Sequence, residues 1–193
     1  PMINGRGYPD TVVPGSLPAP TDNLTPVAGH PAGKITGTGG ELLMHQLVAQ
    51  GVDYAFTNTG SAEAGFFDAF LTVPGVQPIL LLNESLVLSA ADGYARATGK
   101  VGVCVATSGP GATNLVTGLA TAYMDSSPVV AITGQVATPV IGTDAFQEVD
   151  ITGITLPITK HNFLVTSADE VARVASSPLR TRPVGHGMCR APV

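Results

Sequence analysis

Residues 101–114 read VGVCVATSGPGATN, in which a short apolar run is followed by a turn of small residues. The run from Val101 to Thr107 has the length and the valine content of a buried β-strand. The turn leads into Gly111 to Met124, which we predict to be a helix. A strand that passes through a Gly-rich turn into a helix is the repeating unit of parallel sheets. This stretch therefore predicts an α/β fold.

The same alternation of apolar runs and helical patterns extends along the chain in both directions. Each predicted strand is a short, continuous apolar run, which is typical of a parallel sheet covered on both faces. The predicted fold is therefore a doubly wound, mainly parallel sheet with helices on both faces. The predicted helices are 41–50, a segment ending near Phe70, 84–98, 111–124 and a capped start at 167–170, and the predicted strands are 52–57, 77–82, 101–107, 128–133 and 162–165.

The two ends of the chain differ in composition from the region between them. Prolines recur at short intervals through residues 1–34, so we predict an extended or disordered lead-in there. Residues 35–174 carry the regular pattern and are predicted to form the domain. Residues 175–193 are predicted to be an atypical tail, because Ser176-Ser177-Pro178 should break the last helix and no further strand is recognisable. We expect a truncation or a reading-frame change near Val174, which sequencing of the source gene would test.

Composition and charge argue against several classes of protein. Of the 193 residues, 44% are hydrophobic and only 12% are charged, which is typical of one folded domain. The net charge of -5 and the lack of any Lys/Arg run argue against nucleic acid or an anionic membrane as a partner. No apolar run approaches the ~20 residues that cross a bilayer. Low cysteine usage is typical of a reducing compartment, so we expect a cytoplasmic location, with Cys104 as a small core residue.

The candidate ligand-binding positions are the carboxyl ends of the strands, where parallel sheets bind their ligands. These positions are the turns after Thr57, Leu82 and Thr107, and Glu84 lies in the second of them. The spacing leaves two explanations for Glu84 open. It could favour the helix start, where a negative charge gains from a few tenths to about 1 kcal/mol. It could instead be a carboxylate whose pKa is raised by burial, so that it exchanges a proton with a ligand.

Two further stretches have the composition of ligand-binding loops. In Thr107–Asn114 small residues follow a strand, which lets a ligand approach the backbone and the amides of the next helix. No Lys follows the glycines, which excludes a nucleotide-hydrolase phosphate loop, and the Gly-x-Ser-x-Gly spacing of a serine-hydrolase elbow is not found around Ser108. Ile141–Glu148 is too polar for a core segment and too long for a simple turn, which favours a functional loop.

Several short motifs occur in a fixed order between Thr38 and Val174. They are Asn83-Glu84-Ser85, Ala91 to Arg96, Ala106 to Asn114, Ala131 to Gln135, Gly142 to Glu148 and Ile158 to Asn162. This succession resembles acetolactate synthase and related thiamine-diphosphate enzymes such as pyruvate oxidase and benzaldehyde lyase. The resemblance implies the pyrimidine-binding domain of such an enzyme, with a flavodoxin-like three-layer fold and thiamine diphosphate as its cofactor.

The resemblance also implies roles for particular residues. The family glutamate that hydrogen-bonds the aminopyrimidine ring is matched by Glu84, and Gln147 matches a second catalytic residue on the active-site loop. The implied reaction is decarboxylation of a 2-keto acid followed by addition to a second carbonyl compound. Family residues that border the cofactor are matched by Asn58, Gly60, Ser61, Ser108, Gly109, Pro110, Asn114 and Phe146.

The sequence departs from the family pattern at three places. Asn83 replaces the His that often precedes the glutamate, and Thr57–Ser61 replaces a Tyr-Pro-Gly-Gly-like turn. The Gly-Asp-Gly motif and the later Asn that hold magnesium and the diphosphate are not found in the sequence. We therefore expect the magnesium site on a missing domain and no metal site in this chain. A homo-oligomer or a diphosphate-domain partner chain is expected for the same reason.

Three functions from different classes remain open. The chain could be an incomplete thiamine-diphosphate enzyme that needs a diphosphate-binding domain, or a catalytically silent binding or interaction module. It could also be a truncated domain with an unrelated, cofactor-independent hydrolase activity. Loss of ester or glycoside hydrolysis on changing Glu84 or Ser108 to Ala would support the last function, and unchanged rates would exclude it.

Overall fold

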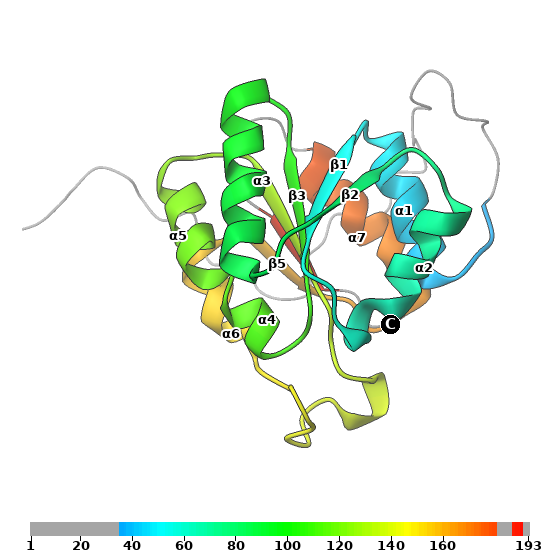
Figure 1. Ribbon diagram of the computed structural model, residues 1–193. Helices are drawn as coiled ribbons and strands as arrows, with labels where there is room; N and C mark the ends of the chain where they lie inside the picture. Colours follow the sequence, from blue (N-terminus) through cyan, green and yellow to red (C-terminus); the bar gives the residue numbers. More distant parts are fainter. Residues whose placement is uncertain (1–34, 181–186, 191–193) are drawn as a thin grey trace, which may run out of the picture.

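The computed structural model describes residues 35–180 and 187–190, which form an α/β domain built on one sheet (Figure 1). The order of the strands in the sheet is β2-β1-β3-β4-β6-β5, and every neighbouring pair is parallel. This arrangement confirms the predicted doubly wound parallel sheet. The strands are β1 (Tyr54–Thr57), β2 (Gln77–Leu80), β3 (Gly102–Ala106), β4 (Val129–Thr133), β5 (His161–Leu164) and β6 (Gly187–Arg190).

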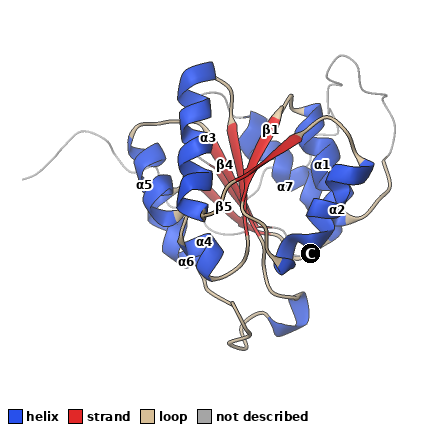
Figure 2. Ribbon diagram, in the orientation of Figure 1, coloured by secondary structure: helices blue, strands red, loops and turns tan. Residues whose placement is uncertain are grey.

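Helices cover both faces of the sheet, as predicted. In Figure 2, α1, α2 and α7 lie on one face, and α3, α5 and α6 lie on the other. No helix in the described part of the chain has the length and apolar character needed to cross a membrane. The helices are α1 (Gly39–Ala49), α2 (Ala64–Thr72), α3 (Glu84–Thr98), α4 (Pro110–Thr113), α5 (Val116–Met124), α6 (Ile151–Thr155) and α7 (Ala168–Arg180), with short 3-10 turns η1 (Ser61–Glu63), η2 (Thr138–Val140) and η3 (Leu156–Ile158).

Each face of the sheet has its own hydrophobic core. The core under α1, α2 and α7 contains Leu47, Phe66 and Val105, and the core under α3 and α5 contains Leu88 and Cys104. Cys104 is fully buried, which confirms its prediction as a core residue, and burial raises the pKa of its thiol. The two cores hold the strand ends rigidly, so the turns that follow them have fixed positions.

The structure differs from the sequence-based prediction in several elements. The helix predicted over 111–124 is divided into α4 and α5, and α6 was not predicted. The strand β2 is mostly exposed rather than covered on both faces, because it lies at the edge of the sheet. Helix α7 continues through Pro178 to Arg180, so the predicted break there is wrong. A proline near a helix end removes one backbone hydrogen bond, but its fixed φ is compatible with the helix.

Residues 175–193, which were predicted to be an atypical tail, contribute one strand to the sheet. Gly187–Arg190 forms β6, which pairs with β4 on one side and with β5 on the other. This strand was not recognised from the sequence because it is short and lacks an apolar run; pairing with two neighbours determines its place. The lead-in predicted over residues 1–34 lies outside the described residues.

The strand order creates a natural ligand-binding edge. The chain runs from β1 outward to β2 and then returns to the other side of β1 as β3, so the order reverses between β1 and β3. In open parallel sheets, ligands bind outside the carboxyl ends of the strands at such a reversal. The turns that follow β1, β2, β3 and β4 all reach this edge, which is where the candidate residues lie.

Candidate functional site

Glu84 lies at the start of α3, where side chains from three turns meet. Asn83 caps the helix, because its side chain accepts a hydrogen bond from the Ser85 amide at 2.9 Å. The Glu84 carboxylate is only 9% exposed. Its Oε1 accepts from Asn58 Nδ2 at 2.7 Å and its Oε2 from Asn114 Nδ2 at 2.9 Å. The turns after β1, β2 and β3 are therefore joined through one carboxylate.

The hydrogen bonds at Glu84 decide its charge. Burial raises the pKa of this carboxyl, but the hydrogen bonds from Asn114, from its own backbone amide and from Asn58 outweigh that effect, so its pKa lies below the ordinary value. The raised pKa that we considered for Glu84 is therefore wrong for this structure. The sequence interpretation considered burial alone and not the two amide donors. Glu84 is an ionised hydrogen-bond acceptor at neutral pH.

Two glycines allow the neighbouring turns to pack closely around Thr107. A Cβ placed on Gly60 would lie 2.2 Å from Thr107 Oγ1, and one placed on Gly111 would lie 2.5 Å from Thr107 Cγ2. The same Gly111 Cβ would be 3.5 Å from Glu84 Oε1. Real Cβ atoms almost never approach other atoms within 3.0 Å, so any side chain at either glycine would force these turns apart. The small residues in both turns are required by this packing.

Glu63, the last residue of η1, is a second buried carboxyl at this edge and was missed by the sequence analysis. It is 3% exposed; its Oε1 accepts from the Gly60 amide at 2.8 Å, while its Oε2 has no hydrogen-bond partner. Burial and the negative charge of Glu84 raise the pKa of this carboxyl, and hydrogen bonding by Thr107 and by backbone amides only partly opposes the rise. Its spacing from Phe66 and Phe70, at positions i+3 and i+7, places Glu63 on the apolar face of α2 and could have revealed it.

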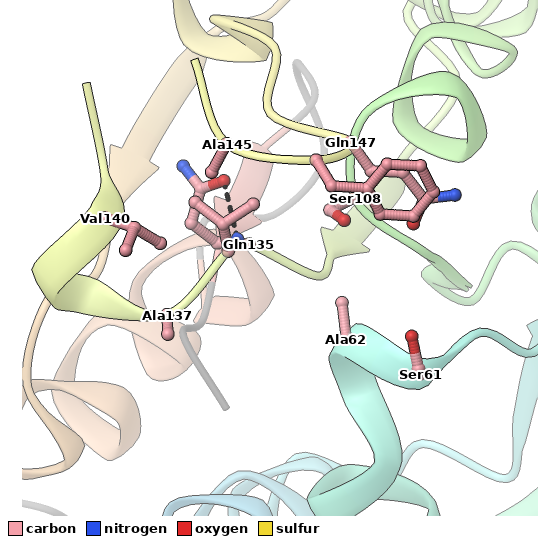
Figure 3. Close-up of a pocket in the computed structure, with 10 residues that line it drawn as sticks. Ser61, Ala62, Ser108, Gln135, Ala137, Val140, Ala145 and Gln147 are labelled. Carbon is pink, nitrogen blue, oxygen red and sulfur yellow. Dashed lines mark hydrogen bonds between the residues drawn. The ribbon is translucent and has the colours of Figure 1, made fainter. Parts of the chain in front are cut away.

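A pocket of about 480 Å³ lies beside this cluster, between η1, the turn after β3 and the loop that follows β4 (Figure 3). Of the predicted site residues, Ser61, Ser108, Phe146 and Gln147 line it. Gln135, which was not predicted, also lines it, and its side chain accepts from the Val136 amide at 2.9 Å. The pocket therefore brings together the residues from the predicted functional loop and from two of the predicted turns.

The remaining predicted residues lie around the pocket rather than in its wall. Gly109 has a φ of 56°, and a Cβ there would lie 2.3 Å from the Gln147 backbone oxygen. Pro110 is the first residue of α4. Asn58, Glu84 and Asn114 form their own cluster and are not among the residues that line the pocket. The structure thus resolves the predicted site into a carboxylate cluster and a pocket, joined by the turn after β3.

The carboxylate cluster suits a ligand that presents a hydrogen-bond donor. Glu84 is ionised and lies at the end of the sheet, and each of its oxygens can accept a further hydrogen bond beside the amide that it already accepts. Gly111 keeps the space next to Oε1 free of a side chain. Among residues 35–180 and 187–190, no group of three or more His, Cys, Asp or Glu is arranged to hold a metal ion.

Comparison with known proteins identifies the family. Residues 37–154, more than half of the chain, match the family described as the thiamine pyrophosphate enzyme N-terminal TPP binding domain. The chain is 57% identical over 136 residues to the acetolactate synthase isozyme 2 large subunit of Escherichia coli. The aligned residues cover 70% of this chain and 25% of that protein.

Two further relatives give the same result. An acetolactate synthase of Mycobacterium bovis is 56% identical over 137 residues, covering 71% of this chain and 22% of that protein. A probable acetolactate synthase large subunit of Methanocaldococcus jannaschii is 54% identical over 133 residues, covering 69% of this chain and 22% of that protein. The chain thus spans about a quarter of the length of the curated relatives it matches. The sheet, the site at its carboxyl edge and the matched residues agree: the chain belongs to the thiamine pyrophosphate enzymes and carries their N-terminal domain, whose cofactor is thiamine diphosphate.

Proposed function

We propose that this chain supplies the pyrimidine-binding half of a thiamine-diphosphate active site that decarboxylates 2-keto acids and joins the product to a second carbonyl compound. The observation that carries the proposal is the ionised Glu84 carboxylate, held by Asn58 and Asn114 at the reversal point of the sheet. The similarity to acetolactate synthases over most of the chain supports the reaction class.

In this proposal Glu84 accepts a hydrogen bond from a ring nitrogen of the aminopyrimidine. Asn58 and Asn114 fix the direction of its carboxylate, and Gly111 leaves room for the ring. When bound, the cofactor supplies the electron sink that decarboxylation requires. Ionised Glu84 favours a proton on the ring nitrogen, which is the part of the chemistry that this chain performs.

The pocket is proposed to receive the 2-keto acid. Gln147 and Phe146 extend from the loop after β4, and Phe146 is 88% exposed, so its ring is free to contact a ligand. Ser61 and Ser108 border the same space, and Gly109 and Pro110 shape the turn between the pocket and Glu84. These residues would orient the substrate rather than react with it.

The diphosphate and its magnesium ion are proposed to be held by a diphosphate-binding domain that lies outside these 193 residues. The support is the length of the relatives, of which the chain spans about a quarter. Cofactor contacts from this chain would then be confined to the aminopyrimidine and thiazolium rings. A consequence is that thiamine and thiamine diphosphate should bind the isolated chain with similar affinity.

Calorimetric titration of the 193-residue chain tests the cofactor site. We expect thiamine, and thiamine diphosphate with magnesium, to bind with similar and weak affinity, with Kd on the order of 1 mM. Glu84→Gln should weaken both by about tenfold, which corresponds to the loss of one charge-assisted hydrogen bond. Asp68→Asn, which removes an exposed carboxylate from α2, is the matched control and should change neither affinity. Binding that survives Glu84→Gln unchanged would exclude the proposed role of Glu84.

The reaction is tested separately. Carbon dioxide release from pyruvate, as a representative 2-keto acid, should require the chain, the cofactor with magnesium and an added diphosphate-domain chain from a relative. Release that Glu84→Gln does not reduce would contradict the proposal. The hydrolase alternative has no supporting observation, since Ser108 is 2% exposed and the described residues that line the pocket include no histidine.

A further inference from the structure

The feature that the proposed function does not use is the pair of unpaired atoms beside Gly60. Glu63 Oε2 and Thr107 Oγ1 are both buried without a hydrogen-bond partner. The two atoms are close to each other, because the Thr107 hydroxyl lowers the pKa of the Glu63 carboxyl. In this rotamer, however, they are not aligned as a hydrogen bond. Buried polar atoms without partners are rare in folded proteins and need an explanation.

A small rotation of the Thr107 hydroxyl pairs both atoms in one bond. The hydroxyl can donate to Oε2 of a carboxylate or accept from Oε2 of a carboxylic acid, so the burial and the neighbouring charges of Glu63 decide which form is present. The surroundings favour the neutral acid: Glu63 is 3% exposed, and Gly134 lies against Oε2, since a Cβ there would be 2.8 Å from it. These neighbours offer no positive charge.

The charged group that acts on Glu63 across the edge is Glu84, from the start of α3. The other residues packed around the carboxyl are uncharged: Gly60 from the turn after β1, Thr107 from the turn after β3 and Gly134 from the end of β4. Two carboxylates at one site do not ionise equally, and the one whose surroundings stabilise the charge less keeps its proton. Glu84 has an amide donor on each oxygen, whereas Glu63 is more deeply buried and its Oε2 has no aligned donor, so Glu63 is the group that remains neutral.

We propose that Glu63 is a positioning residue of the pocket, whose protonated carboxyl joins the Gly60–Ser61 turn to Thr107 and so sets the distance between the two pocket walls. Ser61 and Ala62 form one wall, and Ser108 belongs to the other. Oε1 holds the first turn through the Gly60 amide, and the proton on Oε2 holds the second through Thr107. Loss of this proton places a second negative charge beside Glu84 and reverses the direction of the bond to Thr107, which changes the distance between the walls.

Carboxyl NMR on the full 193-residue chain tests this inference without any cofactor. With the glutamate side chains labelled with ¹³C, Glu63 should titrate above the ordinary glutamate pKa, and its resonance is identified by its disappearance in Glu63→Gln. The backbone amide shifts of Ser61 and Ser108 should follow the same titration in the wild type. Both shifts should become independent of pH in Glu63→Gln, which keeps a donor and an acceptor at this position.

Three outcomes would overturn the inference: a Glu63 pKa at or below the ordinary value, amides of Ser61 and Ser108 that do not follow the titration, or a Glu63 pKa that does not fall in Glu84→Gln. Glu63→Ala should broaden or shift the Ser61 and Ser108 amides at every pH, and Glu63→Gln should restore them. The inference depends on the proposed function at one point only, which is that the pocket receives the 2-keto acid. Failure of cofactor binding would leave the titration unchanged, so the two can fail separately.

Discussion

Glu84 and Glu63 are two carboxyls at the same edge of the sheet, both 9% exposed or less, with opposite shifts of pKa. Glu84 has an amide donor on each oxygen, whereas Glu63 has a donor on one oxygen only. Burial raises the pKa of both groups, so burial alone does not explain the opposite directions. At Glu84 the hydrogen bonds outweigh burial, whereas at Glu63, which is more deeply buried and lies close enough to feel the charge of Glu84, they do not.

The helix dipole does not explain the difference either. Glu84 is the first residue of α3 and Glu63 is the N-cap of α2, so a negative charge is favoured at both positions. Asn58 and Asn114 supply the donors to Glu84, and both come from turns distant in sequence. The charge state of this site is therefore a property of the tertiary structure, which can be tested by changing the turns.

The largest effect is expected at Gly60, which lies between Glu63 and Thr107. In Gly60→Ala the new Cβ would lie 2.2 Å from Thr107 Oγ1 and 2.4 Å from Thr107 Cβ, so the backbone has to move. We expect the free energy of unfolding to fall by about 2 to 3 kcal/mol, measured by urea denaturation. The Glu63 pKa should also return toward its ordinary value, because the opened turn admits water.

Gly93 provides the control for Gly60→Ala. It lies inside α3, and no heavy atom beyond its chain neighbours and the adjacent backbone of its own helix is within 4 Å of a Cβ placed there. Gly93→Ala should stabilise the protein by about 0.5 to 1 kcal/mol, because alanine has the better helix propensity. A neutral Gly60→Ala beside a stabilising Gly93→Ala would show that the two turns are not packed as described.

Glu84 could be located from the sequence and Glu63 was missed, which shows that local signals are the ones a sequence reveals. The predicted strands and helices between residues 41 and 165 are found within a few residues of their predicted ends, because apolar periodicity and glycine positions are local signals. Helix α3, Glu84–Thr98, has its predicted bounds, with Asn83 and Gly99 as its caps. Glu84 could be located for the same reason, since it follows a strand and begins a helix.

What sequence reasoning missed depends on contacts between distant segments. The charge of Glu84 depends on Asn58 and Asn114, which are 26 and 30 residues away. Glu63 is buried because the turn after β3 packs over it, and β6 has its place because it pairs with β4 and β5. None of these pairings has a local signal, so the chemistry of the site could be only partly predicted.

The dependence of stability on pH should separate the two carboxyls. The folded-state pKa of Glu84 is lowered, so its stabilisation is present above the ordinary value of 4.5 and is lost as the pH falls through the folded pKa. The folded-state pKa of Glu63 is raised, so its stabilisation is present below 4.5 and is lost as the pH rises through the folded pKa. Glu84→Gln should flatten the acid limb, and Glu63→Gln the limb above pH 4.5, each by about 1 to 2 kcal/mol.

Urea denaturation between pH 3 and 8 would measure both limbs. Glu41 and Asp53 also have lowered pKa values, so the acid limb of the wild type contains several contributions. The difference between the wild type and each variant isolates the one carboxyl that was changed. If both variants flattened the same limb, the opposite charge states assigned to Glu63 and Glu84 would be wrong.

The smallest effect is expected for Thr107→Val, which keeps the shape of the side chain and removes only its hydroxyl. The Glu63 pKa should rise further, since Thr107 opposes its rise, and the free energy of unfolding should fall by about 0.5 to 1 kcal/mol. Glu84 accepts from Asn58 and Asn114, so its titration should not move. Carboxyl NMR would measure both groups in one sample. A valine that moved the pKa of Glu84 as far as that of Glu63 would mean that the two turns respond as one unit, and the separate surroundings of the two carboxyls would no longer explain why one is charged and the other is not.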